Sequence, residues 1–141
     1  MYQHGHGVSQ DYTEAMKWYR KAADAGNTGA MCLIGRLYRN GLGVSQDYTE
    51  AMRWFRKAAD AGHAMAMCII GGLYEDGKGV LQDYTEAMQW YRKAADAGNA
   101  DAAQRLRELD KPDTAQRLLD AIRLILAAVG FGGWLYLKGC N

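Results

Sequence analysis

The stretch Asn40–Gly62, NGLGVSQDYTEAMRWFRKAADAG, occurs almost unchanged three times in this chain of 141 residues. Its other copies begin 36 residues earlier, at His4, and 36 residues later, at Asp76. Over a longer window, residues 27–62 and 63–98 are identical at 25 of 36 aligned positions. Self-similarity at a fixed period of roughly 20 to 50 residues indicates stacked copies of one structural unit. We therefore expect a solenoid whose terminal units are atypical.

Each unit contains one amphipathic segment, which follows Asp47 and its equivalents. Asp47 precedes Glu50 by three residues, which is a variant of the capping box at helix starts. Apolar residues then recur at helical spacing and predict the buried face: Tyr48, Ala51, Met52, Trp54, Phe55, Ala58 and Ala59. The opposite face is polar: Thr49, Arg53, Arg56 and Asp60. Gly62 can adopt the left-handed backbone conformation that commonly ends such a helix. We expect the equivalent residues Trp18, Trp54 and Trp90 to lie in the core.

A second helix is predicted over about residues 30–38, and it is apolar on most sides. Such a helix must be covered from several directions, which stacked neighbours would achieve. Gly35 and Gly71 each cost about 1 kcal/mol in helix propensity relative to alanine. We expect close approach between helices in return, with Ala51 or Ala58 facing the glycine. The fold class is thus all-α: an α/α solenoid of about three helix pairs, plus a C-terminal hydrophobic helix.

The repeated pattern resembles a known family. The residues that carry the likeness are Gly35, Leu37-Tyr38, Gly41-x-Gly43-Val44, Asp47, Ala51, Trp54-Phe55, Lys57-Ala58-Ala59 and Gly62. They are similar to the Sel-1-like repeat, a relative of the tetratricopeptide repeat, and the match covers about residues 1–109. The resemblance implies a non-catalytic scaffold or adaptor that binds a partner protein or peptide. The domains it implies are a solenoid over residues 1–110, made of a partial repeat 1–27, repeats 28–63 and 64–99 and a degenerate first helix 100–110, followed by a C-terminal segment 111–141.

The same resemblance suggests one enzymatic alternative. Some cysteine-rich relatives are described as β-lactam-binding or hydrolysing, with a disulfide in each repeat, so a β-lactamase-like hydrolase stays open. Here Cys32 and Cys68 occupy one position of successive units, about 10 Å apart by helix packing and beyond disulfide reach. We interpret both as small buried hydrophobes. Ser9 and Ser45 are the only serines, and neither begins an S-x-x-K motif.

We therefore expect no catalytic residue, no metal site and no cofactor. His4 and His6 form an H-x-H pair, but the other copies hold different residues there, so we interpret both as solvated loop residues.

Charge and differences between the copies bear on the partner. The 17 basic and 16 acidic side chains leave a net charge of +1, which gives no reason to expect nucleic acid. Shared positions of a repeat stack are needed for packing, so recognition is expected where the copies differ. The candidate partner-binding residues are Arg36, Arg39, Arg53, Glu75, Lys17 and Gln89. Two further unshared pairs are Asn40 with Asp76 and Leu42 with Lys78. The alternative that all are ordinary solvated positions stays open.

The C-terminal segment changes in character. Asp113 and Gln116 resemble a second capping box, and the 14 residues Leu124–Leu137 carry no charge. Counted from Leu118, the segment reaches 20 residues, about the length of a membrane span, if Asp120 and Arg123 pair with each other or reach the interface. Three alternatives stay open: membrane association through Leu118–Leu137, a helix that folds back to cap the solenoid, and a partner-binding helix.

The N-terminal segment lacks the first helix of its unit. A helix over residues 11–25 would then expose Tyr12, Met16 and Tyr19, so we expect either a chain fragment or self-association through this N-terminal face. The first ten residues lack the basic and apolar regions of a secretory signal. We expect a cytoplasmic or cytoplasm-facing protein, or a periplasmic or secreted one if a signal peptide precedes this sequence.

Overall fold

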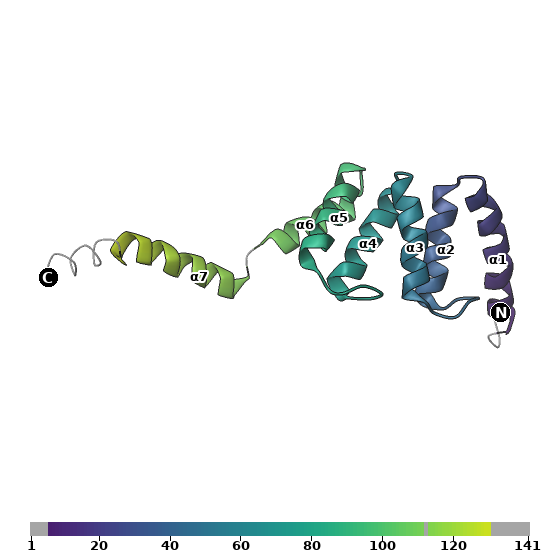
Figure 1. Ribbon diagram of the computed structural model, residues 1–141, viewed down its shortest axis with the longest axis horizontal. Helices are drawn as coiled ribbons and strands as arrows, with labels where there is room; N and C mark the ends of the chain where they lie inside the picture. The colour runs from purple at the N-terminus through teal and green to yellow at the C-terminus, as the bar shows by residue number, and fades with distance from the viewer. Residues whose placement is uncertain (1–5, 112, 131–141) are drawn as a thin grey trace, which may run out of the picture. The chain divides into compact units, whose positions relative to one another are not determined.

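The computed structural model describes residues 6–111 and 113–130 of the chain. Within these residues, seven α-helices are followed by one π-helical turn: α1 (His6–Asp24), α2 (Thr28–Asn40), α3 (Tyr48–Asp60), α4 (Ala64–Asp76), α5 (Tyr84–Asp96), α6 (Ala100–Asp110), α7 (Thr114–Ile125) and η1 (Leu126–Gly130). From α1 to α5, each helix packs against the next one in the chain, side by side (Figure 1). The predicted all-α solenoid is confirmed.

The chain consists of two compact units, and the boundary between them lies between Arg107 and Glu108, inside α6. The first unit holds the helix pairs of the repeats. The second holds the end of α6, α7 and η1, and each unit is described by itself.

Aspartates begin α3 and α5, as the sequence predicts. The Asp47 side chain accepts a hydrogen bond from the backbone N–H of Glu50 at 3.0 Å, and Asp83 does the same for Glu86 at 3.1 Å. The predicted capping box is only half formed, however. The backbone N–H of Asp47 donates to the Tyr38 carbonyl at 2.9 Å, while the Glu50 carboxylate accepts from Arg53 at 3.0 Å. The start of α3 is therefore tied to the end of α2 rather than closed on itself.

The core of the first unit consists of two clusters of buried side chains. One joins α1 to α2: Met16, Ala23, Ala30, Ile34 and Leu37. The prediction that Tyr12, Met16 and Tyr19 would be exposed is wrong, because Met16 is buried in this cluster and both tyrosines are half-buried against it, covered by α2. The other joins α2, α3 and α4: Cys32, Ala51, Met52, Phe55, Ala58, Ala59, Ala66, Ile70 and Leu73. Helix α2 contributes to both clusters from opposite faces, which confirms that it is covered from several sides. Of the apolar face predicted for α3, five residues are buried: Ala51, Met52, Phe55, Ala58 and Ala59.

Gly35 in α2 and Gly71 in α4 lie against aromatic rings. A Cβ atom on Gly35 would meet Cε1 of Phe55 at 2.6 Å, and one on Gly71 would meet Cε1 of Tyr91 at 2.7 Å. Close approach between the helices is as predicted. The prediction of Ala51 or Ala58 as the facing residue is wrong, because the absent side chain makes room for a ring of the next helix.

The three tryptophans are not equally buried. Trp54 is half-buried against the α1–α2 cluster, and Trp90 is half-buried against the cluster that joins α2, α3 and α4. Trp18 is 64% exposed, so its prediction as a core residue is wrong. The reason is its position in the stack. Trp54 is covered by the helix pair before it, and within the described residues no helix precedes α1.

Helix α1 is longer than predicted at its N-terminal end. Residues 6–10 are helical, whereas their equivalents Leu42–Gln46 form the loop between α2 and α3, so the loop prediction for His6 is wrong. That loop is held by the preceding helix, for example through the Leu42 N–H bonded to the Leu37 carbonyl at 3.0 Å. The equivalent of Leu37 is Met1, which lies outside the described residues together with His4.

Helix α7 begins as predicted, with the Asp113 side chain accepting from the backbone N–H of Gln116 at 2.6 Å. Its large apolar side chains, continued by those of η1, are exposed: Leu118, Leu119, Ile122, Leu124, Ile125, Leu126 and Val129. Among the helices of residues 6–111 and 113–130, none has the length and apolar character needed to cross a membrane. Part of the predicted segment Leu118–Leu137 lies outside these residues.

Candidate functional site

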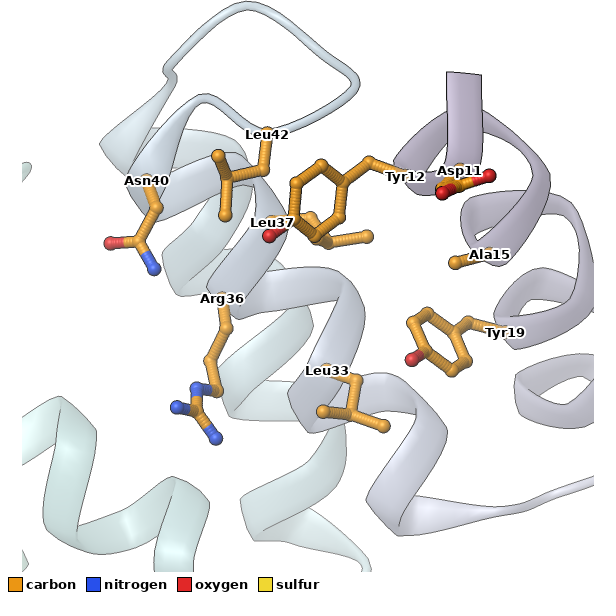
Figure 2. A pocket seen from close by; sticks show the side chains of 9 residues that line it. All are labelled: Asp11, Tyr12, Ala15, Tyr19, Leu33, Arg36, Leu37, Asn40 and Leu42. Carbon is orange, nitrogen blue, oxygen red and sulfur yellow. The ribbon is translucent and has the colours of Figure 1, made fainter. Parts of the chain in front are cut away.

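A first pocket of about 380 Å³ opens between α1 and α2 (Figure 2). Its wall from α1 includes the rings of Tyr12 and Tyr19, which face α2 and the following loop. Among the described residues, most of the lining consists of aliphatic and aromatic side chains: Tyr12, Ala15, Tyr19, Leu33, Leu37 and Leu42. The other three lining residues carry charged or amide groups: Asp11, Arg36 and Asn40. We call this pocket 1.

A second pocket of about 300 Å³ lies one repeat further along. We call it pocket 2. Six of its lining residues are the 36-residue equivalents of residues in pocket 1: Tyr48, Ile69, Gly72, Leu73, Asp76 and Lys78. The other three, Arg39, Asn40 and Gln46, come from the end of α2 and the loop after it. Asn40 lines both pockets, so the two adjoin. The repeat therefore creates one surface feature twice, along the first helices of successive pairs.

The two pockets differ where the copies of the repeat differ. Pocket 1 has Arg36, Asn40 and Leu42 at three of the equivalent positions. Pocket 2 has Gly72, Asp76 and Lys78 instead. Asp11 lines only pocket 1 and Arg39 lines only pocket 2. Among the described lining residues, pocket 1 therefore has one cation and one carboxylate beside an apolar wall, whereas pocket 2 has two cations and one carboxylate.

The polar wall of pocket 2 is held in place by the loop. The side-chain amide of Gln46 donates to the backbone carbonyl of Arg39 at 2.8 Å and to the Tyr48 hydroxyl at 3.2 Å. The guanidinium of Arg39 also donates to Asn40 at 3.3 Å. One repeat later Gln82 forms the equivalent bonds, to the Glu75 carbonyl at 2.9 Å and the Tyr84 hydroxyl at 3.1 Å. Loop position and pocket wall are therefore fixed by the repeat itself.

The structure separates the predicted site residues into two groups. Arg36 lines pocket 1 and Arg39 lines pocket 2. Lys17, Arg53 and Gln89 lie at equivalent exposed positions of α1, α3 and α5 and line neither pocket. Lys17 pairs with Glu14 at 3.5 Å, and Arg53 pairs with Glu50 at 3.0 Å. Both pairs are exposed contacts within one helix, which contribute little to stability.

Glu75 is not at the surface, so its prediction as an exposed partner-binding residue is wrong. The residue is buried, and its carboxylate accepts from the hydroxyl of Tyr91 at 3.0 Å and from Arg105 of α6. Burial, together with this hydrogen bond and the Glu75 charge, raises the pKa of Tyr91 above its ordinary value. Arg105 and Tyr91 replace the apolar Ile69 and Phe55 of the preceding repeat. A carboxylate needs such donors once it leaves water, which explains why this charge is internal.

Sequence reasoning missed several residues of the pockets. Tyr48 and Leu37 are shared between copies, so the sequence predicts only a packing role for them, while Tyr12 is predicted as an exposed residue of the N-terminal face. They pack, yet each also presents part of its side chain to a pocket. Leu42 and Lys78 could be recognised from the sequence, because they occupy one of the two positions at which the loops 41–46 and 77–82 differ.

The cysteines of the described residues are free thiols. Cys32 is buried and Cys68 half-buried, and burial raises the pKa of each. A raised pKa lowers the thiolate fraction at neutral pH, which makes both poor nucleophiles. Cys140 lies outside the described residues. No group of three or more metal-ligating side chains comes together within residues 6–111 and 113–130.

These observations first define a class of protein. In this chain, helix pairs stack in chain order and a pocket recurs along their first helices. This is the architecture of α-helical repeat proteins. The Sel1 repeat model matches residues 1–27, 28–63 and 64–99. The chain belongs to the Sel1 repeat family, which confirms the resemblance drawn from its motifs. Proteins of this family are generally interaction scaffolds, and nothing in the described residues or the comparisons indicates hydrolase activity.

Solved structures similar to this chain are repeat proteins of the same kind. A Sel1 repeat protein from Oxalobacter formigenes is 45% identical over 72% of this chain and 42% of its own, with a TM-score of 0.65. The protective antigen c5321 of uropathogenic Escherichia coli, described as having an SLR fold, is 42% identical over 72% of this chain and 22% of its own, with a TM-score of 0.65. Cysteine-rich protein B of Helicobacter pylori is 26% identical over 64% of this chain and 68% of its own, with a TM-score of 0.62.

The chain thus spans less than half the length of the first two of these proteins. A comparison with curated protein sequences gave no significant match.

Proposed function

We propose that this protein is a non-catalytic scaffold that binds an extended segment of a partner protein along pockets 1 and 2. One observation carries the proposal: two adjoining pockets lie at equivalent places of successive repeats and differ in the residues that the repeats do not share. Stacked repeats bind partners through such extended surfaces. An extended peptide suits a surface that repeats along one direction, because its side chains also recur at a regular distance.

The experiment compares the pockets with the outer face of the second helices. Random peptides displayed on phage are selected on the immobilised full chain, and the affinity of enriched peptides is measured by fluorescence anisotropy. Leu33→Glu and Ile69→Glu each place a charge in the apolar wall of a pocket. Arg53→Glu and Gln89→Glu place the same side chain on the outer face.

The pocket variants should weaken binding by about tenfold or more, which corresponds to about 1.4 kcal/mol. The outer-face variants should leave the affinity within about twofold. Circular dichroism checks that all four variants remain helical. The reverse order of effects would overturn the proposal in favour of the group formed by Lys17, Arg53 and Gln89, whose role in binding stays a prediction.

Absence of catalysis has a separate test. Nitrocefin reports hydrolysis of a β-lactam ring by a change in colour. Purified full chain should hydrolyse it no faster than the same preparation after heat denaturation. Turnover above that background would favour the hydrolase alternative.

Three predictions from the sequence supplement the scaffold proposal. Membrane association through the C-terminal segment is supported by the exposed apolar face of α7, and flotation with liposomes tests it. Self-association through the N-terminal face is supported by the exposed ring of Trp18, and sedimentation equilibrium tests it. A cytoplasmic or cytoplasm-facing location rests on the sequence alone, and cell fractionation tests it.

A further inference from the structure

We infer that pockets 1 and 2 recognise different side chains of one bound peptide: an apolar side chain in pocket 1 and a carboxylate in pocket 2. This inference rests on the proposed function and deepens it by naming the chemistry of the partner. It starts from the contrast between two sites that share a backbone but not their charges.

Pocket 1 is suited to an apolar side chain. Tyr12, Leu33 and Leu42 are among its walls, and burying their remaining surface against an apolar group is favourable by about 25 cal/mol per Å². Among the described residues that line it, the charged groups Arg36 and Asp11 have opposite signs, so this part of the lining carries no net charge that would select an ionic side chain.

Pocket 2 is suited to a carboxylate. The cations of Arg39 and Lys78 exceed the single carboxylate of Asp76, and neither cation pairs with an acidic residue in the described part of the chain. The Tyr48 hydroxyl accepts the hydrogen bond of Gln46, which leaves its own proton free to donate. Hydrogen bonds from cations to a carboxylate are about twice as strong as neutral ones.

The geometry sets the spacing between the two side chains. Asn40 lines both pockets, so one short segment can reach them together. Equivalent points of packed helices lie on the order of 10 Å apart, and an extended chain advances about 3.3 Å per residue. The expected segment therefore carries an apolar residue and, about three residues away, an aspartate or a glutamate.

The test uses a library of random dodecapeptides displayed on phage and selected on the full chain. Enriched peptides should combine an aliphatic or aromatic residue with an acidic residue about two to four positions away. The two most enriched peptides are then synthesised with the acid intact and with Glu→Gln or Asp→Asn. Loss of the acid should weaken binding at least about fivefold at low salt, because a charge-assisted hydrogen bond is lost.

Variants of the chain locate the effect. Arg39→Gln with Lys78→Gln removes both cations of pocket 2 and should abolish the difference between the acidic and the amide peptide. Lys17→Gln with Arg53→Gln removes the same charges from the outer face and should preserve that difference. Leu42→Lys gives pocket 1 the lysine that pocket 2 has at the equivalent position, and it should weaken binding of both peptides.

The outcomes of the selection and of the variants separate the specificity inference from the proposed function. Enriched peptides without an acidic residue, or an acid preference that survives removal of Arg39 and Lys78, would overturn the inference. If such peptides still lose affinity with Leu33→Glu, the proposed function stands and only the specificity is wrong. If no peptide is enriched above a heat-denatured control, the proposed function fails together with the inference.

Discussion

Arg105 of α6 donates hydrogen bonds to both carboxylate oxygens of Glu75 in α4, thirty residues away, with Nε 3.2 Å from Oε2. The hydroxyl of Tyr91 donates to Oε2 as well, at 3.0 Å. One repeat earlier, the same three positions are filled differently: Arg39, Phe55 and Ile69. The three changes compensate one another, because each donor matches a need of the buried carboxylate. The network joins α6 to the preceding helix pair, α4 and α5.

Removal of the Arg105 side chain should destabilise the first compact unit, which holds the repeats. Arg105→Ala leaves the carboxylate of Glu75 buried with Tyr91 as its remaining donor in this network. We expect the free energy of unfolding in urea to fall by about 1–3 kcal/mol, less than for a fully buried pair because 45% of the Arg105 side chain is exposed. The triple change Glu75→Arg, Tyr91→Phe and Arg105→Ile copies the preceding repeat and should stay within about 1 kcal/mol of the natural chain. An Arg105→Ala protein as stable as the natural one would contradict this account.

Tyr91 should make stability depend on pH in the alkaline range. Its pKa in the folded protein is raised, so between the unfolded value of about 10 and the higher folded value the folded state binds one more proton. Stability from this group is complete below pH 10 and falls above it, by about 1.4 kcal/mol per pH unit. Urea unfolding of the natural chain and of Tyr91→Phe at pH 8 to 11 checks this. The two curves should diverge only above about pH 10.

Substitution by alanine should have opposite effects on stability at two helical glycines, Gly35 and Gly72. Gly35→Ala places Cβ 2.6 Å from the Phe55 ring, and we expect a loss of about 1–3 kcal/mol despite the better helix propensity. At Gly72 the nearest atom to a new Cβ is the Tyr91 hydroxyl at 3.6 Å, so Gly72→Ala should stabilise by about 0.5–1 kcal/mol. Thermal and urea unfolding measure both. Adding Phe55→Leu to Gly35→Ala should recover part of the loss, and no recovery would exclude the ring as its cause.

The equivalent tryptophans should differ in their contribution to stability. Trp54→Ala removes a ring packed against the α1–α2 cluster, and we expect a loss of about 1–3 kcal/mol in the free energy of unfolding. Trp18→Ala removes an exposed ring whose main described contact is with the ammonium of Lys21 at 4.8 Å, so the loss should be about 0.5 kcal/mol. A large loss at Trp18 would show that another surface covers it in solution, and sedimentation equilibrium would then identify self-association.

Local patterns in the sequence predicted much of the fold. The 36-residue period, Asp47 before α3, Gly62 after it and the apolar stripe between them depend on interactions close in the chain, so they could be recognised without a structure. The differences between the copies also indicated Arg36 and Arg39 as surface residues. Both line pockets, and whether they bind a partner stays a prediction.

Contacts between repeats could not be predicted in this way. The sequence shows that Glu75 differs from Arg39, but only the structure shows that Arg105 and Tyr91 surround it. The same holds for Trp18, whose exposure depends on what stacks before α1. Apart from the helical residues 6–10, the sequence by itself determined where the helices of the repeats lie and which face of the second helix of each pair is apolar, because both follow from spacing along one helix. Only the tertiary structure decided which shared residues still reach a pocket and which charge is internal, because burial depends on neighbours supplied by other repeats.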